Sequence, residues 1–215
     1  MRQNNTWVFW DIGGVFDRFV EDSFLDSLSL LFRVKAEELL NFFREGDPSF
    51  WHRIESEPEW DARKIHAEFC ERFGKNVSFG VFIRSFNAGI ISADFDRELI
   101  RLLEDINLAG ISQGIISNIN SIHAECVEKN FLYILKHIPR GHRHYSYVIG
   151  VYKSRTPEAF LKVFDLSGAD PKNSYFIDDR EYNIEGFERA GGTGILFHGY
   201  HDVRFQLKRR GLPLP

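Results

Sequence analysis

The sequence lacks the features that would mark a secreted or membrane protein. It has only two cysteines, Cys70 and Cys126, far apart in stretches with a helical pattern. We therefore expect no disulfide framework, and we interpret each thiol as a small core residue. No apolar run approaches the ~18 residues of a membrane span, and the first one, at 7–10, is too short for a signal peptide. A soluble protein of the reducing cytoplasm, without a membrane partner, is expected.

An excess of charge of one sign is also lacking. The 215 residues include 27 Lys and Arg against 31 Asp and Glu, a net charge of −4 with no basic stripe. Nucleic acid is therefore not expected as a partner. Hydrophobic residues make up 43%, enough for one full core or two small ones. The many phenylalanines fall at helical spacing, which indicates packing rather than a stacking surface. The oligomeric state is left open.

Hydrophobic periodicity divides the chain into two regions. Between 21 and 86 the apolar residues recur at steps of three and four, which predicts helices, with breaks at Asp47-Pro48 and Glu57-Pro58. After this helical unit, strands and helices alternate. The expected strands are 7–10, 114–116, 147–149, 175–177 and 194–197, and the expected helices are 97–108, 123–129, 157–166 and 183–190. This alternation predicts an α/β fold, a parallel sheet with helices on both faces.

Polar residues come just after four of these strands. They are Asp11, the pair Ser117-Asn118, Lys153 and the pair Asp178-Asp179. In an open parallel sheet, ligands bind beyond the carboxyl ends of the strands. Four separate polar signals therefore converge on one edge of the sheet.

Asp11 is the candidate nucleophile. It follows an apolar strand and precedes Ile12-Gly13-Gly14. A carboxylate at this place can simply cap the loop, or it can attack phosphorus and form an aspartyl-phosphate. Gly13 and Gly14 would let backbone amides approach a phosphate closely, so they are candidate substrate-binding residues.

Asp178 and Asp179 form the second acidic signal. Adjacent acids at a strand end can cap the following helix, or they can bind a metal. Mg²⁺ prefers hard oxygen ligands. Asp11 and Asp178 could supply two of them, and the Gly13 carbonyl a third. The metal would neutralise charge that otherwise repels a carboxylate from a phosphate dianion.

Ser117 and Lys153 complete the candidate site. The Ser117 hydroxyl can donate to a phosphoryl oxygen, assisted by the backbone amide of Asn118. Lys153 is a compact cation that can neutralise phosphate charge and fix the nucleophile.

In this order the motifs resemble those of the haloacid dehalogenase-like (HAD) superfamily. They are Trp7-Val8-Phe9-Trp10-Asp11-Ile12-Gly13-Gly14-Val15, Gly114-Ile115-Ile116-Ser117-Asn118, Gly150-Val151-Tyr152-Lys153 and Tyr175-Phe176-Ile177-Asp178-Asp179. The stretch 178–191 is similar to the branch that contains small sugar-phosphate phosphatases. The resemblance implies a Rossmann-like core (1–17 and 92–215) with an inserted helical cap (18–91).

The same resemblance implies roles for the site residues. Asp11 would be phosphorylated, Ser117 would bind the phosphoryl group and Lys153 would stabilise it. Asp178 would hold Mg²⁺, and Asp179 would support the metal shell. The implied substrate is a small phosphate monoester, a sugar phosphate or similar metabolite.

Two departures from the family pattern stand out. Gly13 takes the place of a second aspartate that serves most family phosphatases as general acid and base. Without a replacement, departure of the leaving group should be slower by roughly 10²–10⁴-fold, and Asp17 is the nearest spare carboxylate. The family lysine is usually followed closely by proline, whereas Lys153-Ser154-Arg155-Thr156-Pro157 is one residue longer. Arg155 is therefore an alternative to Lys153.

Other interpretations stay open at this stage. A 2-haloacid dehalogenase would also use an aspartate nucleophile and would tolerate Gly13, although the paired acids argue for a metal. A third interpretation is a catalytically silent protein with a binding or regulatory function. The histidines and arginines of 137–144 are interpreted as a solvated basic loop rather than a zinc site. Trp51 and Trp60 are interpreted as cap packing residues.

Overall fold

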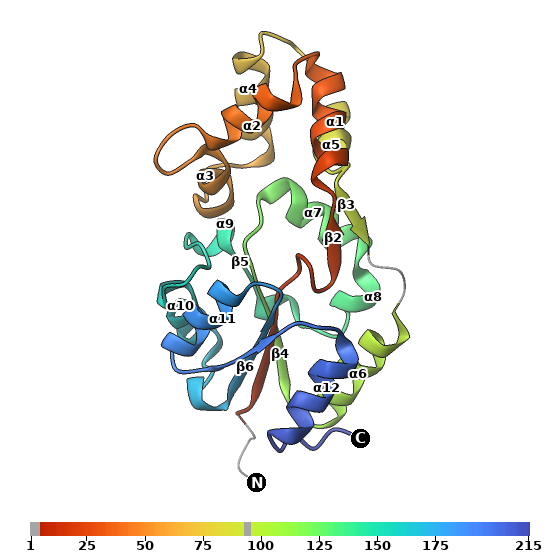
Figure 1. The fold of residues 1–215 in the computed structure, drawn as a ribbon, viewed down its shortest axis with the longest axis vertical. Helices are drawn as coiled ribbons and strands as arrows, with labels where there is room; N and C mark the ends of the chain where they lie inside the picture. The colour runs from red at the N-terminus through yellow and green to blue at the C-terminus, as the bar shows by residue number, and fades with distance from the viewer. Residues whose placement is uncertain (1–4, 93–95) are drawn as a thin grey trace.

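The computed structural model describes residues 5–92 and 96–215, which form a sheet-based core and a helical cap above it (Figure 1). Residues 1–4 and 93–95, which the sequence analysis assigns to the core, lie outside the described residues. The five strands run in the order β5-β4-β1-β6-β7, and all neighbours are parallel. The strands are β1 (Trp7–Trp10), β4 (Ser112–Ser117), β5 (Arg143–Tyr145), β6 (Ser174–Asp178) and β7 (Thr193–Leu196). The predicted parallel α/β fold is confirmed.

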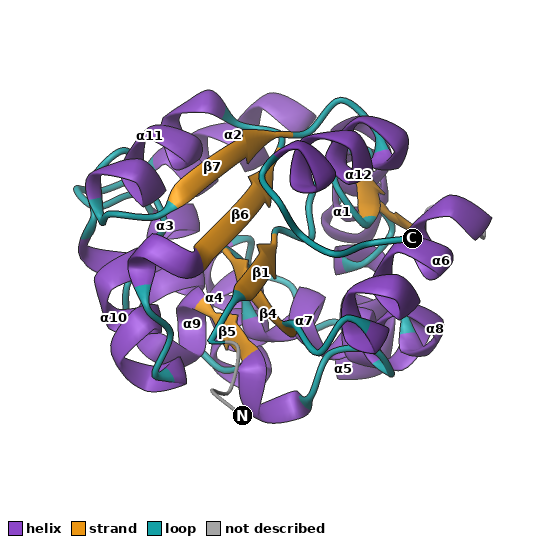
Figure 2. Ribbon diagram, turned by 90° about the horizontal axis from the view of Figure 1, so that it is seen from below, coloured by secondary structure: helices purple, strands orange, loops and turns teal. Residues whose placement is uncertain are grey.

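Helices cover both faces of this sheet (Figure 2). The core helices are α6 (Arg97–Leu108), α7 (Ser121–Asn130), α8 (Leu132–Leu135), α9 (Ser146–Ile149), α10 (Glu158–Ser167), α11 (Glu181–Arg189) and α12 (Tyr200–Arg209), with 3₁₀ turns at Arg140–His142 and Pro171–Asn173. Successive side chains of the central strand β1 point to opposite faces of the sheet. Val8 and Trp10 join the cluster with α6, α7, α8 and α12, whereas Trp7 and Phe9 join the one with α10 and α11. Burial on both faces explains why this strand is apolar throughout.

The cap consists of five helices that share one aromatic core. They are α1 (Glu21–Phe32), α2 (Ala36–Arg44), α3 (Phe50–Ser56), α4 (Ala62–Arg72) and α5 (Phe79–Phe86). Their buried cluster contains Phe24, Phe32, Phe42, Phe43, Phe50, Trp60, Phe69, Phe82 and Phe86. The prediction that the aromatic residues serve packing is confirmed for this set. None of the helices in the described ranges is long and apolar enough to span a bilayer.

An antiparallel two-stranded ribbon joins the cap to the core. Strand β2 (Asp17–Phe19) leads into the cap and β3 (Ile90–Ser92) leads out of it. The predicted cap boundaries, 18 and 91, fall within these two strands. Both strands lie close to the carboxyl edge of the main sheet (Figure 1), so the ribbon brings the cap over the predicted site.

The strand predicted at 147–149 is wrong. These residues belong to the short helix α9, which ends at Gly150 in the left-handed conformation (φ 70°). The edge strand is β5 instead, four residues earlier. Val148 is 57% exposed, so its β-branched side chain is not packed in the hydrophobic core. Local β propensity was overridden here by tertiary packing.

The interpretation of 137–144 as a solvated basic loop holds for the exposed turn at Arg140 and is wrong for Arg143 and His144. His144 is buried in β5, and burial lowers its pKa to about 4, which favours the neutral imidazole. Arg143 donates from Nη1 to Glu128 Oε2 over 2.5 Å and from Nη2 to two backbone carbonyl groups. This segment therefore forms the edge of the sheet and the turn before it.

Candidate active site

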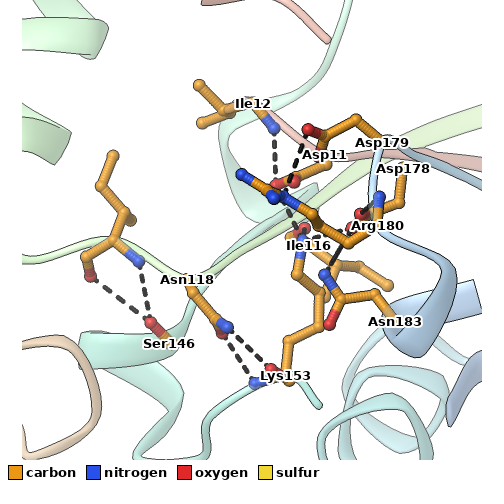
Figure 3. A network of polar contacts seen from close by, with 11 residues as sticks. Asp11, Ile12, Ile116, Asn118, Ser146, Lys153, Asp178, Asp179, Arg180 and Asn183 are labelled. Atoms are coloured by element: carbon orange, nitrogen blue, oxygen red, sulfur yellow. Dashed lines mark hydrogen bonds and ion pairs between the residues drawn. The ribbon is translucent and has the colours of Figure 1, made fainter. Parts of the chain in front are cut away.

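A cavity of about 420 Å³ lies where the carboxyl edge of the sheet meets the cap. The predicted site residues that line it are Asp11, Gly13, Gly14, Ser117, Asn118, Lys153 and Asp179. Asp178 is fully buried directly behind Lys153. The structure therefore brings all the candidate residues together, from the ends of β1, β4 and β6 and from the loop after α9. Figure 3 shows Asn118, Lys153 and the three acids of this group.

Asp11 is held by one carboxylate oxygen and leaves the other free. Its Oδ1 accepts hydrogen bonds from the Ile12 amide and from Lys153 Nζ, both over 2.8 Å. Its backbone amide donates to the Ile177 carbonyl over 2.9 Å, which ties the loop to β6. No donor among the described residues binds Oδ2. A carboxylate fixed at one oxygen and free at the other is suited to attack or to metal binding.

Lys153 lies between two buried carboxylates. Its Nζ contacts Asp11 Oδ1 at 2.8 Å and Asp178 Oδ2 at 2.6 Å. Burial alone would lower the pKa of this lysine, but the two carboxylates raise it above its ordinary value. Lys153 is therefore charged, and it balances part of the negative charge of the cluster.

The geometry decides between Lys153 and Arg155. Arg155 pairs with Glu185 at the surface, where the two side chains are 61% and 45% exposed. Lys153 occupies the predicted place, although it follows helix α9 and a short loop rather than a strand, as the sequence analysis expected.

The side chain of Asn118 clamps the backbone of Lys153. Its Nδ2 donates to the Lys153 carbonyl, and its Oδ1 accepts from the Lys153 amide, both over 2.7 Å. The predicted contribution of Asn118 to substrate binding was its backbone amide. The side chain therefore has a different task, which is to join the loop after β4 to the lysine loop.

Asn118→Ala removes both hydrogen bonds of this clamp. We expect it to lower the free energy of unfolding by about 1–3 kcal/mol, because two half-buried backbone groups lose their partner. A displaced Lys153 should also lower kcat by about tenfold or more. Urea unfolding measures the first effect, and the rate of turnover measures the second. Asn130→Ala, at an exposed asparagine whose side chain donates to Cys126 Sγ, is the control and should change stability by less than about 0.5 kcal/mol.

Three acids form a group that fits a divalent cation. Asp11, Asp178 and Asp179 each offer a carboxylate oxygen, and these atoms lie within 4.8 Å of one another. Burial raises the pKa of Asp11, the neighbouring Asp178 adds to this rise, and Lys153 opposes it. A cation would relieve this crowding of negative charge. The hard oxygen donors suit Mg²⁺.

Gly14 allows the loop after β1 to lie against this acidic group. Its φ of 75° is in the left-handed region, and a Cβ atom on it would overlap the Asp179 carboxylate. Only glycine fits both constraints. Asp179 itself is half-buried and pairs with Arg180 at 3.3 Å.

Asp178 is oriented by three further hydrogen bonds, which come from two donor groups. The Asn183 side-chain amide contacts both of its carboxylate oxygens, at 3.1 and 3.0 Å, and the Arg180 backbone amide donates to Oδ1 over 2.8 Å. Together with Lys153 these contacts fix the carboxylate at the end of β6 (Figure 3).

The cavity also contains residues to which the sequence analysis assigned no part in the site, including Trp51, which it interpreted as a packing residue. From the cap come Glu55 and Trp51, and from the core come Tyr152, Tyr182 and His123. Trp51 both lines the cavity and packs on the cap cluster, whereas Trp60 is buried in that cluster as predicted. The only signal for Glu55 was its place among acidic residues near Trp51. Helical periodicity assigns a face to such a residue but does not say which neighbour that face meets.

The spare carboxylate Asp17 does reach the site. It lines the cavity, and its Oδ1 is buried with no hydrogen-bond partner in the described structure. A Cβ atom on Gly13 would lie 4.0 Å from that oxygen. Burial raises the pKa of Asp17 to about 7.

Comparisons with known proteins agree with this architecture. A family model for haloacid dehalogenase-like hydrolases matches residues 8–191. A HAD-family enzyme of Bacteroides thetaiotaomicron superposes with a TM-score of 0.79 at 22% identity, over 93% of this chain and 98% of that one. A structure of the same enzyme in complex with magnesium and inorganic phosphate gives 0.76 at 22% identity, over 89% and 93%.

A second similar structure is a 2-haloacid dehalogenase of Pseudomonas syringae. Its TM-score is 0.66 at 18% identity, over 96% of this chain and 99% of that one. At such identities the superpositions establish the fold alone. The family model covers most of the chain, from the first strand to the end of α11, and with the converging site residues it leads to one conclusion: this protein belongs to the haloacid dehalogenase-like hydrolase family.

Proposed function

We propose that the protein is a Mg²⁺-dependent phosphohydrolase that forms an aspartyl-phosphate on Asp11. The observation that carries the proposal is the state of the Asp11 carboxylate. One oxygen is fixed by Ile12 and Lys153, and the other is free beside two further acids. A similar structure contains magnesium and inorganic phosphate, which is consistent with this chemistry.

Each residue has a defined task in this proposal. Asp11 Oδ2 attacks phosphorus, while Lys153 holds Oδ1 and offsets the charge of the phosphoryl oxygens. Ser117 donates its hydroxyl to a phosphoryl oxygen. Asp11, Asp178 and Asp179, with the Gly13 carbonyl, hold the Mg²⁺, which when bound neutralises charge between the carboxylate and the phosphate dianion.

The substrate is proposed to be a small phosphorylated metabolite. A cavity of about 420 Å³ between the sheet edge and the cap is in the range of small-molecule sites. No nucleic acid or membrane takes part in the proposed reaction, and the cytoplasm is its proposed location.

The competing function is dehalogenation of a 2-haloacid. Its substrate is a carboxylate, and the three clustered acids would repel that anion in the absence of a cation. The phosphatase therefore accounts for Asp178 and Asp179, whereas the dehalogenase does not.

A screen of phosphate release over a few dozen phosphorylated metabolites and p-nitrophenyl phosphate tests the proposal. With Mg²⁺ we expect turnover, and with EDTA a loss of at least about 10²-fold, because the metal supplies several kcal/mol of charge stabilisation. Chloride release from 2-chloropropionate that persists in EDTA would favour the dehalogenase instead. Tight ligand binding without turnover would favour a silent binding protein.

A further inference from the structure

Glu55 is a buried carboxyl group that the proposed reaction has not yet used. It lies on α3 of the cap, is 6% exposed and lines the same cavity as Asp11. It interacts electrostatically with both Asp11 and Lys153. Glu55 therefore faces the reacting carboxylate from the cap side, where the leaving group of a phosphate ester on Asp11 would lie.

Residues from both parts of the protein surround this carboxyl group. Tyr152 of the core and Trp51 of the cap line the same cavity, and both side chains act on the pKa of Glu55. The ring of His52 packs on Tyr152, with 4.4 Å between the ring centroids. Tyr152 directly precedes Lys153 in the sequence. The same loop therefore brings Tyr152 close to Glu55 and Lys153 close to Asp11.

The surroundings of Glu55 favour the neutral form of its carboxyl group. Burial raises the pKa of its carboxyl to about 8; hydrogen bonds from Tyr152 and Trp51 and the charge of Lys153 lower it in part, and Asp11 raises it further. A neutral carboxyl group does not repel a phosphate dianion. It can also donate a proton, which a glutamate with its ordinary pKa could not do at this pH.

We propose that Glu55 is the general acid that protonates the leaving group. It would take the role of the family aspartate that Gly13 replaces. This proposal rests on the proposed phosphatase function. As the Asp11 Oδ2–phosphorus bond forms and the ester P–O bond breaks, the Glu55 proton passes to the departing oxygen and an alcohol leaves. In the second half, the Glu55 carboxylate takes a proton from the water that attacks phosphorus. Asp11 then departs as a carboxylate, phosphate is released, and Glu55 is neutral again.

Asp17 is the alternative acid. It lies on strand β2 and interacts electrostatically with Asp179 of the acidic cluster. Glu55 reaches the cavity from helix α3 of the cap instead, and matched variants of the two residues decide between them.

The dependence on the leaving group tests the proposal. Phenyl phosphate and p-nitrophenyl phosphate have nearly the same shape, but p-nitrophenoxide is a much weaker base and needs little protonation. We expect Glu55→Gln to lower kcat/KM for phenyl phosphate by about 10²-fold and for p-nitrophenyl phosphate by less than about fivefold. Retained turnover of the nitrophenyl ester also verifies that the variant is folded. In the wild type, turnover of phenyl phosphate should fall above pH ~8, and in Glu55→Gln this fall should be absent.

Asp17→Asn is the matched control, because it makes the same carboxyl-to-amide change in the same cavity. It should affect the two esters equally. An equal effect of Glu55→Gln on both esters, or a selective loss in Asp17→Asn, overturns the assignment of Glu55 and leaves the phosphatase intact. A wild-type protein that hydrolyses neither ester with Mg²⁺ contradicts both proposals.

Discussion

Asp11→Asn should lower Mg²⁺-dependent phosphate release by at least about 10⁴-fold for every substrate, because an amide oxygen cannot serve as the nucleophile. The exchange is nearly isosteric. The side-chain oxygen of the introduced amide can still accept from the Ile12 amide and from Lys153, which bind Asp11 Oδ1 at 2.8 Å in the wild type. The fold should therefore be kept, and the loss of activity should come from the missing nucleophile rather than from unfolding. Initial rates with p-nitrophenyl phosphate measure it.

The covalent step can be observed directly. Wild-type protein quenched in acid during turnover of a radiolabelled ester should retain label, and Asp11→Asn should retain none. Asp17→Asn, the neighbouring carboxyl-to-amide change, should still retain label. Full activity in Asp11→Asn would remove the assignment of the nucleophile.

The part of the site on the core was predictable because its signals are local. β1 is apolar at all four positions and central in the sheet, so the end of the strand, and with it Asp11, is marked in the sequence. Asp178 ends β6 in the same way. Parallel strands end at a common edge, so separate motifs could be brought together without coordinates.

The cap side of the site was not predictable, because it depends on how two packed bodies meet. Glu55 lies on a seven-residue helix whose periodicity indicates a buried face. Whether that face meets the cap core or the catalytic cavity depends on contacts between α3 and α9, far apart in sequence. The error at 147–149 arose from the same cause, since long-range pairing placed the edge strand in the more polar segment, 143–145.

Lys153→Met should damage both stability and catalysis. The lysine is 2% exposed and pairs with two buried carboxylates. Removal of one partner from such a group costs about 3–5 kcal/mol, because charge is left buried without compensation. Loss of a cation beside the phosphoryl group should also lower kcat by about 10²–10³-fold.

The stability loss of Lys153→Met should depend on pH and on Mg²⁺. Without the lysine, which lowers the pKa of Asp11 in the wild type, the folded-state pKa of Asp11 rises further, so the folded protein keeps a proton that the unfolded chain releases. The deficit in unfolding free energy should therefore grow as the pH rises from 5 to 8. Mg²⁺ should reduce the deficit, because it binds the same carboxylates in the folded state.

Urea unfolding of Lys153→Met at both pH values, with Mg²⁺ and with EDTA, measures these effects. Arg155→Met is the control. Arg155 pairs with Glu185 at the surface, where an ion pair contributes less than about 1 kcal/mol. The stability loss of Arg155→Met should therefore be small and independent of Mg²⁺. A larger loss of stability and of kcat in Arg155→Met than in Lys153→Met would show that Arg155 has the role assigned to Lys153. A deficit that Mg²⁺ leaves unchanged would mean that the three acids do not act as one cation site.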